Sequence, residues 1–122
     1  MDDPLIEVEY MYKVHVIRVV DGDTVDVEVD LGFDIKLKKR VRLHGIDAPE
    51  IRTRDKQEKV AGYKSKEFLE QVVKDNDGMF YMSSQDKGKY GRCIGILFEK
   101  DFYDESLNDR MIYEGHAKPY GK

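Results

Sequence analysis

The stretch TVDVEVDLGFDIKLKKRVRLH, residues 24–44, decides the fold because it has the pattern of two strands joined by a short loop. Apolar and polar residues alternate in both halves, which is typical of strands with one buried face. Only Lys39 interrupts the apolar side. The apolar positions are Val25, Val27, Val29 and Leu31 in the first half and Ile35, Leu37, Val41 and Leu43 in the second. We therefore expect a hairpin whose apolar face lies in the core.

The polar faces of this hairpin carry opposite charges. Asp26, Glu28 and Asp30 are acidic, whereas Lys36, Lys38, Arg40, Arg42 and His44 form a basic stripe. Opposite charges that face each other across two strands stabilise a sheet by about 0.2–1 kcal/mol per pair. Cross-strand pairing therefore explains most of the charge at Lys36, Lys38 and Arg40 without a functional role.

The remaining segments predict further strands and two helices. Residues 6–20 are rich in Val, Ile and Tyr, which favours one long strand or two strands in line. Gly22 ends this segment, and we expect its turn to use a positive φ. The other expected elements are a helix over 57–74, strands over 79–84 and 92–99, and a helix over 105–114 closed by Gly115 at its C′ position.

The predicted order is three strands, a helix, two strands and a helix. This order indicates a mainly β protein with helices, or α+β in some schemes, built as a five-stranded Greek-key barrel (βββαββα) of the oligonucleotide/oligosaccharide-binding kind, the OB-fold. We expect one domain over residues 1–122, in which residues 1–11 are an extension or the start of the first strand. Such a fold predicts a binding surface and says nothing about chemistry.

Composition sets limits on the function. Charged residues make up 38% of the 122, the net charge is −4, and Cys93 is the single cysteine, so no internal disulfide is expected. No apolar run approaches the roughly 18 residues of a membrane span, and the acidic start MDDPLIEVEY is unlike a signal peptide. We expect no membrane contact and a monomer, and infer no protein partner. The compartment stays open: cytoplasmic, or exported with a signal already removed.

Three segments carry polar residues that packing does not require: DGDT at 21–24, RLHGIDAPE at 42–50 and KYGR at 89–92. Phosphodiester hydrolysis needs cations near the phosphate oxygens and a group that deprotonates or orients water. Asp23 and Asp47 are carboxylates suited to a hard divalent cation. Arg42 and Arg92 can each contact two phosphate oxygens at once.

Other interpretations of these residues remain open at this point. Asp47 and Glu50, three residues apart with a proline between them, also match the start of a helix, with Asp47 as N-cap and Glu50 at N3. Asp21 and Asp23 could serve only to form a turn. Arg42 and Arg92 could be ordinary surface cations paired with acids.

Taken together, VVDGDTV, VRLHGIDAPE and GKYGR resemble the staphylococcal nuclease (thermonuclease) family over roughly residues 12–120. The resemblance implies a calcium site formed by Asp23, Asp47 and the carbonyl of Ala48 and supported by Asp21 and Thr24. It implies that Arg42 and Arg92 hold the phosphate and that Glu50 acts on the attacking water. It also implies a substrate pocket lined by Lys89, Tyr90 and, more loosely, Tyr120.

The implied activity is calcium-dependent hydrolysis of DNA and RNA between the phosphorus and the 5′ oxygen, which leaves 3′-phosphate ends. The alternative from another class is an OB-fold domain that binds nucleic acid or acts as a scaffold without catalysis. The net charge of −4 argues mildly against any nucleic-acid partner, because phosphate binding depends on Lys and Arg. The distribution of charge matters more than the total.

Overall fold

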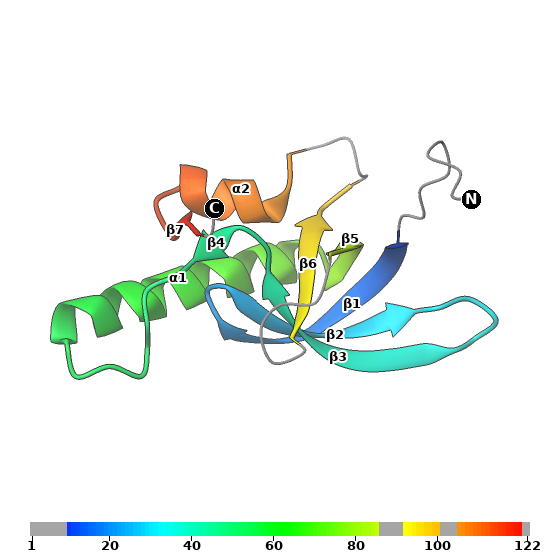
Figure 1. Cartoon of the computed structure of the whole chain (residues 1–122), viewed down its shortest axis with the longest axis horizontal. Helices are drawn as coiled ribbons and strands as arrows, with labels where there is room; N and C mark the ends of the chain where they lie inside the picture. The colour runs from blue at the N-terminus through cyan, green and yellow to red at the C-terminus, as the bar shows by residue number, and fades with distance from the viewer. Residues whose placement is uncertain (1–9, 86–91, 101–104, 121–122) are drawn as a thin grey trace, which may run out of the picture.

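The computed structural model of the chain describes residues 10–85, 92–100 and 105–120. Within these ranges the strands are β1 (Tyr10–Asp21), β2 (Thr24–Asp30), β3 (Lys36–Leu43), β4 (Ile46–Asp47), β5 (Met79–Gln85), β6 (Cys93–Phe98) and β7 (Lys118–Pro119). The helices are α1 (Lys56–Asp75) and α2 (Leu107–Tyr113). Figure 1 shows how they are arranged.

Five of the strands close into a barrel in the order β1-β2-β3-β6-β5. β3 and β6 pair in parallel, and the other neighbours, including β1 with β5, pair antiparallel. The predicted fold class, a five-stranded OB-type barrel with helices, is confirmed.

Alternating valines from β1 and β2 fill the barrel. Each strand turns one face inward, and the two helices supply further apolar side chains. The most deeply buried members of this core are Val14, Val25, Val27, Val41, Leu43, Ile46, Leu69, Leu97, Leu107 and Met111. Because both helices insert residues into this core, they are fixed relative to the strand ends that they cover.

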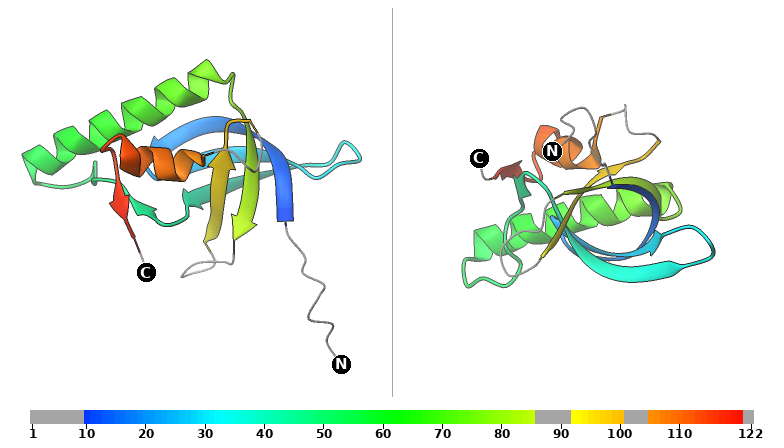
Figure 2. Two further views of the ribbon diagram at one scale, coloured as in Figure 1. Left: turned by 90° about the horizontal axis from the view of Figure 1, so that it is seen from above. Right: turned by 45° about the vertical axis from the view of Figure 1, so that its right-hand side comes forward.

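The hairpin formed by β2 and β3 extends past the barrel (Figures 1 and 2). β3 pairs with β6 only through Val41–Leu43, so its residues 36–40 have no strand on that edge among the described residues. Leu31, Ile35 and Leu37 are 41%, 53% and 43% exposed. The expectation that these three residues are buried is therefore wrong, because this part of the hairpin extends past the barrel and, among the described residues, β6 pairs with β3 only as far as Val41.

The helices begin at capping residues that differ from the sequence expectation. Asp55 is the N-cap of α1, and its side chain accepts hydrogen bonds from the amides of Gln57 and Glu58. Asp47 and Glu50 therefore do not cap a helix. α2 begins two residues later than expected, after the N-cap Ser106, and Gly115 follows it with a φ of 81° at the predicted C′ position.

A two-stranded sheet of β4 and β7 was not expected from the sequence, since two-residue strands are too short to show a pattern. Ile46 pairs with Pro119 and Asp47 with Lys118. The amide of Tyr120 adds a 2.9 Å hydrogen bond to the carbonyl of Gly45. This sheet brings the segment after α2 against residues 45–47, close to Arg42.

Candidate active site

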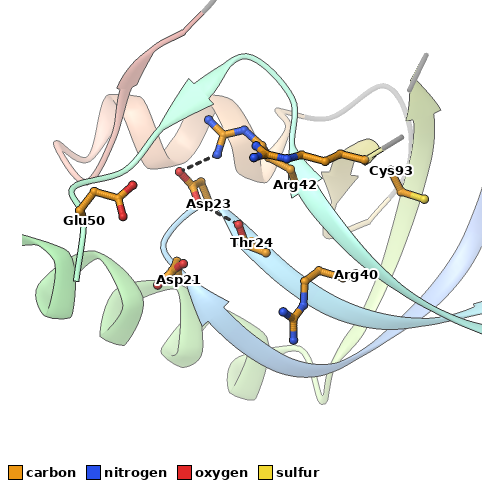
Figure 3. Close-up of a pocket in the computed structure, with 8 residues that line it drawn as sticks. Asp21, Asp23, Thr24, Arg40, Arg42, Glu50 and Cys93 are labelled. Carbon is orange, nitrogen blue, oxygen red and sulfur yellow. Dashed lines mark hydrogen bonds and ion pairs between the residues drawn. The ribbon is translucent and has the colours of Figure 1, made fainter. Parts of the chain in front are cut away.

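A pocket of about 440 Å³ lies where the β1–β2 turn, β3 and the start of β6 meet (Figure 3). It is lined by Asp21, Asp23, Thr24, Arg40, Arg42, Glu50, Arg92 and Cys93. Six of these residues are sequence-predicted site residues, drawn from all three polar segments. Arg40 and Cys93 were not expected there.

Asp23 joins two of these segments. Its carboxylate accepts hydrogen bonds from the Thr24 hydroxyl and from the Ala48 amide, both at 3.0 Å, and lies 3.1 Å from Nη1 of Arg42. The residue is only 6% exposed. Burial of a carboxylate is costly without hydrogen-bonding partners, so these contacts fix the DGDT turn against the loop after β3.

Arg42 has three further neighbours besides Asp23, namely Ile46, Asp47 and Tyr120. Nη2 donates a 3.0 Å hydrogen bond to the carbonyl of Ile46 and lies 3.8 Å from Oδ1 of Asp47. The guanidinium carbon lies 5.0 Å from the centre of the Tyr120 ring, which is within range of a cation–π contact. Arg42 therefore contacts the loop after β3, both carboxylates that are candidate metal ligands, and the segment after α2.

The structure does not place every expected residue in this pocket. Asp47 and Ala48 line a neighbouring hollow of about 520 Å³, together with Pro49, Glu58 and Lys118 among others. Arg42 is the link between the two, since it contacts both Asp23 and Asp47. Lys89 and Tyr90 lie outside the described residues.

Gly22 is required for close packing. Its φ is not positive, contrary to the sequence expectation. A side chain at this position would collide with Ser65 of α1 and would come within 2.9 Å of the Ala48 side chain. Ser65 is fully buried and donates a 2.8 Å hydrogen bond to the carbonyl of His116. The DGDT turn therefore lies directly against α1.

Helix α1 also determines the position of Glu50. A Cβ atom at Gly62 would lie 2.9 Å from the carbonyl oxygens of both Pro49 and Glu50. Glu58 accepts a 3.1 Å hydrogen bond from the Glu50 amide. Sequence analysis missed both Gly62 and Glu58; a glycine inside an otherwise regular helix, which costs about 1 kcal/mol relative to alanine, was the available signal for the first.

Asn108 is a further residue that sequence analysis missed. It is 3% exposed, and its amide group accepts a hydrogen bond from the Leu97 amide at 3.0 Å. It also donates to the carbonyls of His44 and Gly95, at 2.9 Å and 3.1 Å. These bonds connect α2 to β6 and to the residue that begins the loop after β3.

The carboxylates of the pocket disfavour one another's charge. Burial, followed by the charges of Asp21, Asp23, Asp47 and Glu58, raises the pKa of Glu50. Burial and the charge of Asp23 raise the pKa of Asp21. A bound cation would relieve this repulsion, and carboxylate oxygens are the ligands that a hard divalent ion prefers. The residues present therefore fit such an ion, although no ready-made group of three or more His, Cys, Asp or Glu ligands occurs in the described ranges.

The fold and the pocket define a small OB-type barrel that carries two arginines and several carboxylates at one site. The family model described as "Staphylococcal nuclease homologue" matches residues 40–122. The chain belongs to this family.

Three curated proteins are similar to the chain. An uncharacterized protein of Methanocaldococcus jannaschii is 30% identical over 128 residues, covering 89% of this chain and 59% of that protein. Protein ParB of Escherichia coli is 31% identical over 111 residues, covering 86% and 55%. The thermonuclease of Staphylococcus hyicus is 27% identical over 110 residues, covering 90% and 59%. The chain thus spans between 55% and 59% of the length of these relatives.

None of the helices in the described part of the chain is long and apolar enough to cross a membrane.

Proposed function

We propose that the chain is a calcium-dependent phosphodiesterase that hydrolyses DNA and RNA between phosphorus and the 5′ oxygen and leaves 3′-phosphate ends. The observation that carries the proposal is the pocket in which Arg42 and Arg92 occur with Asp21, Asp23 and Glu50. Family membership and the similarity to a thermonuclease support it.

In this proposal Asp23, Asp47 and the carbonyl of Ala48 hold Ca²⁺, and Asp21 and Thr24 support them. When bound, the ion supplies positive charge beside the phosphate oxygens. The donor set and the raised pKa values of Asp21 and Glu50 are consistent with a cation at this position.

The chain's own side chains have separate roles in the reaction. Arg42 and Arg92 bind the phosphate oxygens and stabilise the negative charge that grows in the transition state. Glu50 accepts a proton from the attacking water or orients it, and its raised pKa makes it a better base than an ordinary exposed glutamate. The family resemblance gives Lys89, Tyr90 and Tyr120 roles in substrate binding, and of these Tyr120 contacts the guanidinium of Arg42.

Incubation with denatured DNA in Ca²⁺ and in chelator tests the proposal. We expect metal-dependent loss of substrate, products with 3′-phosphate ends, and loss of turnover in Glu50→Gln. Cleavage that leaves 3′-hydroxyl ends would contradict the reaction class, and the absence of cleavage in Ca²⁺ would contradict the enzymatic role.

One observation favours the second function, binding without catalysis. Asp23 and the Ile46 carbonyl both hold the guanidinium of Arg42, so a phosphate has to compete with them for this side chain. A salt-sensitive affinity for single strands, without cleavage under any metal condition, would support this alternative.

A further inference from the structure

A further hollow, of about 380 Å³, lies beside the candidate active pocket and is strongly basic. Its charged lining residues are Arg18, Asp26, Lys38, Lys39 and Arg40, and Ile17 and Val27 complete it. Four cations and one carboxylate give these residues a formal charge of +3, in a chain whose net charge is −4. We call this hollow the basic pocket.

The one carboxylate of the basic pocket is already engaged. Arg40 donates to both oxygens of Asp26, with Nε at 2.8 Å and Nη2 at 3.2 Å. The hydrogen bond to Arg40 holds the pKa of Asp26 below its usual range, so this carboxylate stays ionised at neutral pH. Arg18, Lys38 and Lys39 have no ion pair within 4.0 Å among the described residues, which leaves three cations for a ligand.

The basic pocket adjoins the candidate active pocket, because Arg40 lines both. Arg42, Arg40, Lys38 and Lys36 follow one another at alternate positions of β3, about 6.6 Å apart along the strand. Residues 36–40 of this strand have no neighbour on the edge away from β2 within the described ranges. An extended polyanion that leaves the active pocket along β3 would therefore meet a cation at every second residue of this strand.

We propose that the basic pocket binds the phosphate backbone of the nucleic-acid strand on one side of the scissile bond. The inference rests on the proposed function, which supplies the strand. A polyanion is the partner that matches the charge. A second copy of the chain does not match, because pairing two β3 edges would bring the sequence KLKKR against itself.

The tip of the β2–β3 hairpin lies beyond the row of cations along β3, which we call the track. Phe33 is 96% exposed and, with Asp34, has a positive φ, 54° and 61°. Residues other than glycine rarely adopt left-handed conformations, so the turn presents an aromatic ring to solvent on a backbone that is unfavourable for such residues. Single-strand binding proteins stack bases on such rings. Asp30 faces Lys36 in register and offsets its charge, so we place the main affinity in the basic pocket and not nearer the tip. Glu28 faces Lys38 in register, but the two form no ion pair within 4.0 Å among the described residues.

Binding of labelled single strands of about 4 and about 16 nucleotides, the range covered by one OB-fold, tests the inference. The measurement is made in chelator so that no strand is cleaved. Lys38→Gln/Lys39→Gln should weaken binding of the longer strand at least about 10-fold at low salt, and should flatten the plot of log affinity against log salt by about 1.4, from two contacts of about 0.7 each. The loss should be smaller for the shorter strand.

Two further variants sharpen the test. Asp26→Asn removes the carboxylate and releases Arg40, so it should tighten binding of the longer strand, a gain that loss of a structural contact does not produce. Lys59→Gln/Lys64→Gln removes the same charge from exposed positions of α1 that line none of these pockets, and should bind as the wild type does. Equal losses in the two double variants would overturn the proposal, since they would show an effect of net charge alone.

The role of the hairpin tip is tested by comparing two variants that each remove one exposed aromatic ring. Phe33→Ala should weaken binding of the longer strand, whereas Tyr113→Ala, an 85% exposed aromatic residue on α2, should not. Loss of binding to phosphatidylserine vesicles in Phe33→Ala, with strand affinity unchanged, would instead assign the tip to a membrane surface and overturn its place in the track.

The outcomes separate this inference from the proposed function. A wild-type protein that binds and cleaves strands, with an unchanged affinity in Lys38→Gln/Lys39→Gln, overturns the inference alone. A wild-type protein that neither binds nor cleaves strands overturns the proposed function, and the inference with it.

Discussion

The guanidinium of Arg42 lies 3.1 Å from the carboxylate of Asp23, so the residue expected to hold phosphate contacts a residue expected to hold metal. Both side chains are mostly buried, at 20% and 8% exposure. Removal of either side chain would therefore leave the other charge buried without its partner, which is strongly destabilising. Metal and phosphate binding should be coupled through this pair, since a cation that attracts Asp23 leaves Arg42 free for the substrate.

Replacement of Arg42 by lysine should lower turnover at least about 10²-fold, the scale of losing one transition-state donor. Lysine keeps the charge, but its single ammonium lacks the planar fork of two nitrogens with which Arg42 contacts Asp23 and the Ile46 carbonyl and with which a guanidinium binds two phosphate oxygens. We expect the same for Arg92→Lys. The measurement is kcat on denatured DNA in Ca²⁺, with Arg54→Lys, an exposed arginine outside the pocket, as the control. Rates like the wild type in both variants would show that the arginines are misassigned.

Sequence patterns predicted the barrel because its strands carry an alternation that one buried face imposes, as at Val25, Val27 and Val29. The same alternation failed at Ile35 and Leu37, since a period of two shows which residues share a face and does not show whether anything covers that face. Whether these residues are buried depends on how far β6 pairs along β3, and this pairing joins segments that are far apart in the sequence.

The sequence identified the polar segments of the site, but it did not reveal the packing contacts and strand pairing that hold these segments together. Gly22 and Gly62 allow close approach between segments far apart in the chain. Gly62 stands out locally because it interrupts a regular helix, but a glycine in a turn, such as Gly22, looks the same whether or not another segment packs against it. The β4–β7 pairing, which brings Tyr120 to Arg42, depends on two-residue strands that have no pattern of their own.

Glu58 should act as a positioning residue for Glu50, because its carboxylate accepts a 3.1 Å hydrogen bond from the Glu50 amide. Loss of one such hydrogen bond costs about 1 kcal/mol, which corresponds to a roughly 5-fold fall in kcat if it moves Glu50 out of place. We expect this fall in Glu58→Ala with little change in KM, and recovery in Glu58→Gln, which keeps an acceptor oxygen. Glu67→Ala, an exposed position on the same helix, is the control. Equal rates in the Ala and Gln variants would argue against positioning by this bond.

Gly62→Ala should destabilise the fold and reduce turnover together. An exposed glycine in a helix would gain about 1 kcal/mol on this change. Here the added methyl group lies 2.9 Å from two backbone oxygens, of Pro49 and Glu50, and backbone cannot move aside as cheaply as a flexible side chain can. Overpacking of this kind costs about 1–3 kcal/mol, so we expect net destabilisation in urea titrations.

Lys64→Ala is the matched control for Gly62→Ala, since it gains helix propensity at an exposed position of α1 without a clash. A Gly62→Ala variant with increased stability and full kcat would show that the loop carrying Glu50 adjusts freely and is not held by α1.

Asp21→Asn should stabilise the metal-free protein at neutral pH. Burial and the charge of Asp23 raise the pKa of Asp21 above 3.8 in the folded state, so the ionised side chain opposes folding. The penalty is absent below pH 3.8, appears as the pH rises through the folded pKa, and is fully present at neutral pH. The stability difference between Asp21→Asn and wild type, from urea titrations in chelator, should therefore shrink toward acid pH. Asp23 has three hydrogen-bonding or ionic partners, and Asp23→Asn should destabilise instead. Addition of Ca²⁺ should reverse this order of stability and make the wild type more stable than Asp21→Asn, because an ion that the wild type binds more tightly stabilises it more. If the order of stability does not change with calcium, Asp21 is not part of the metal site.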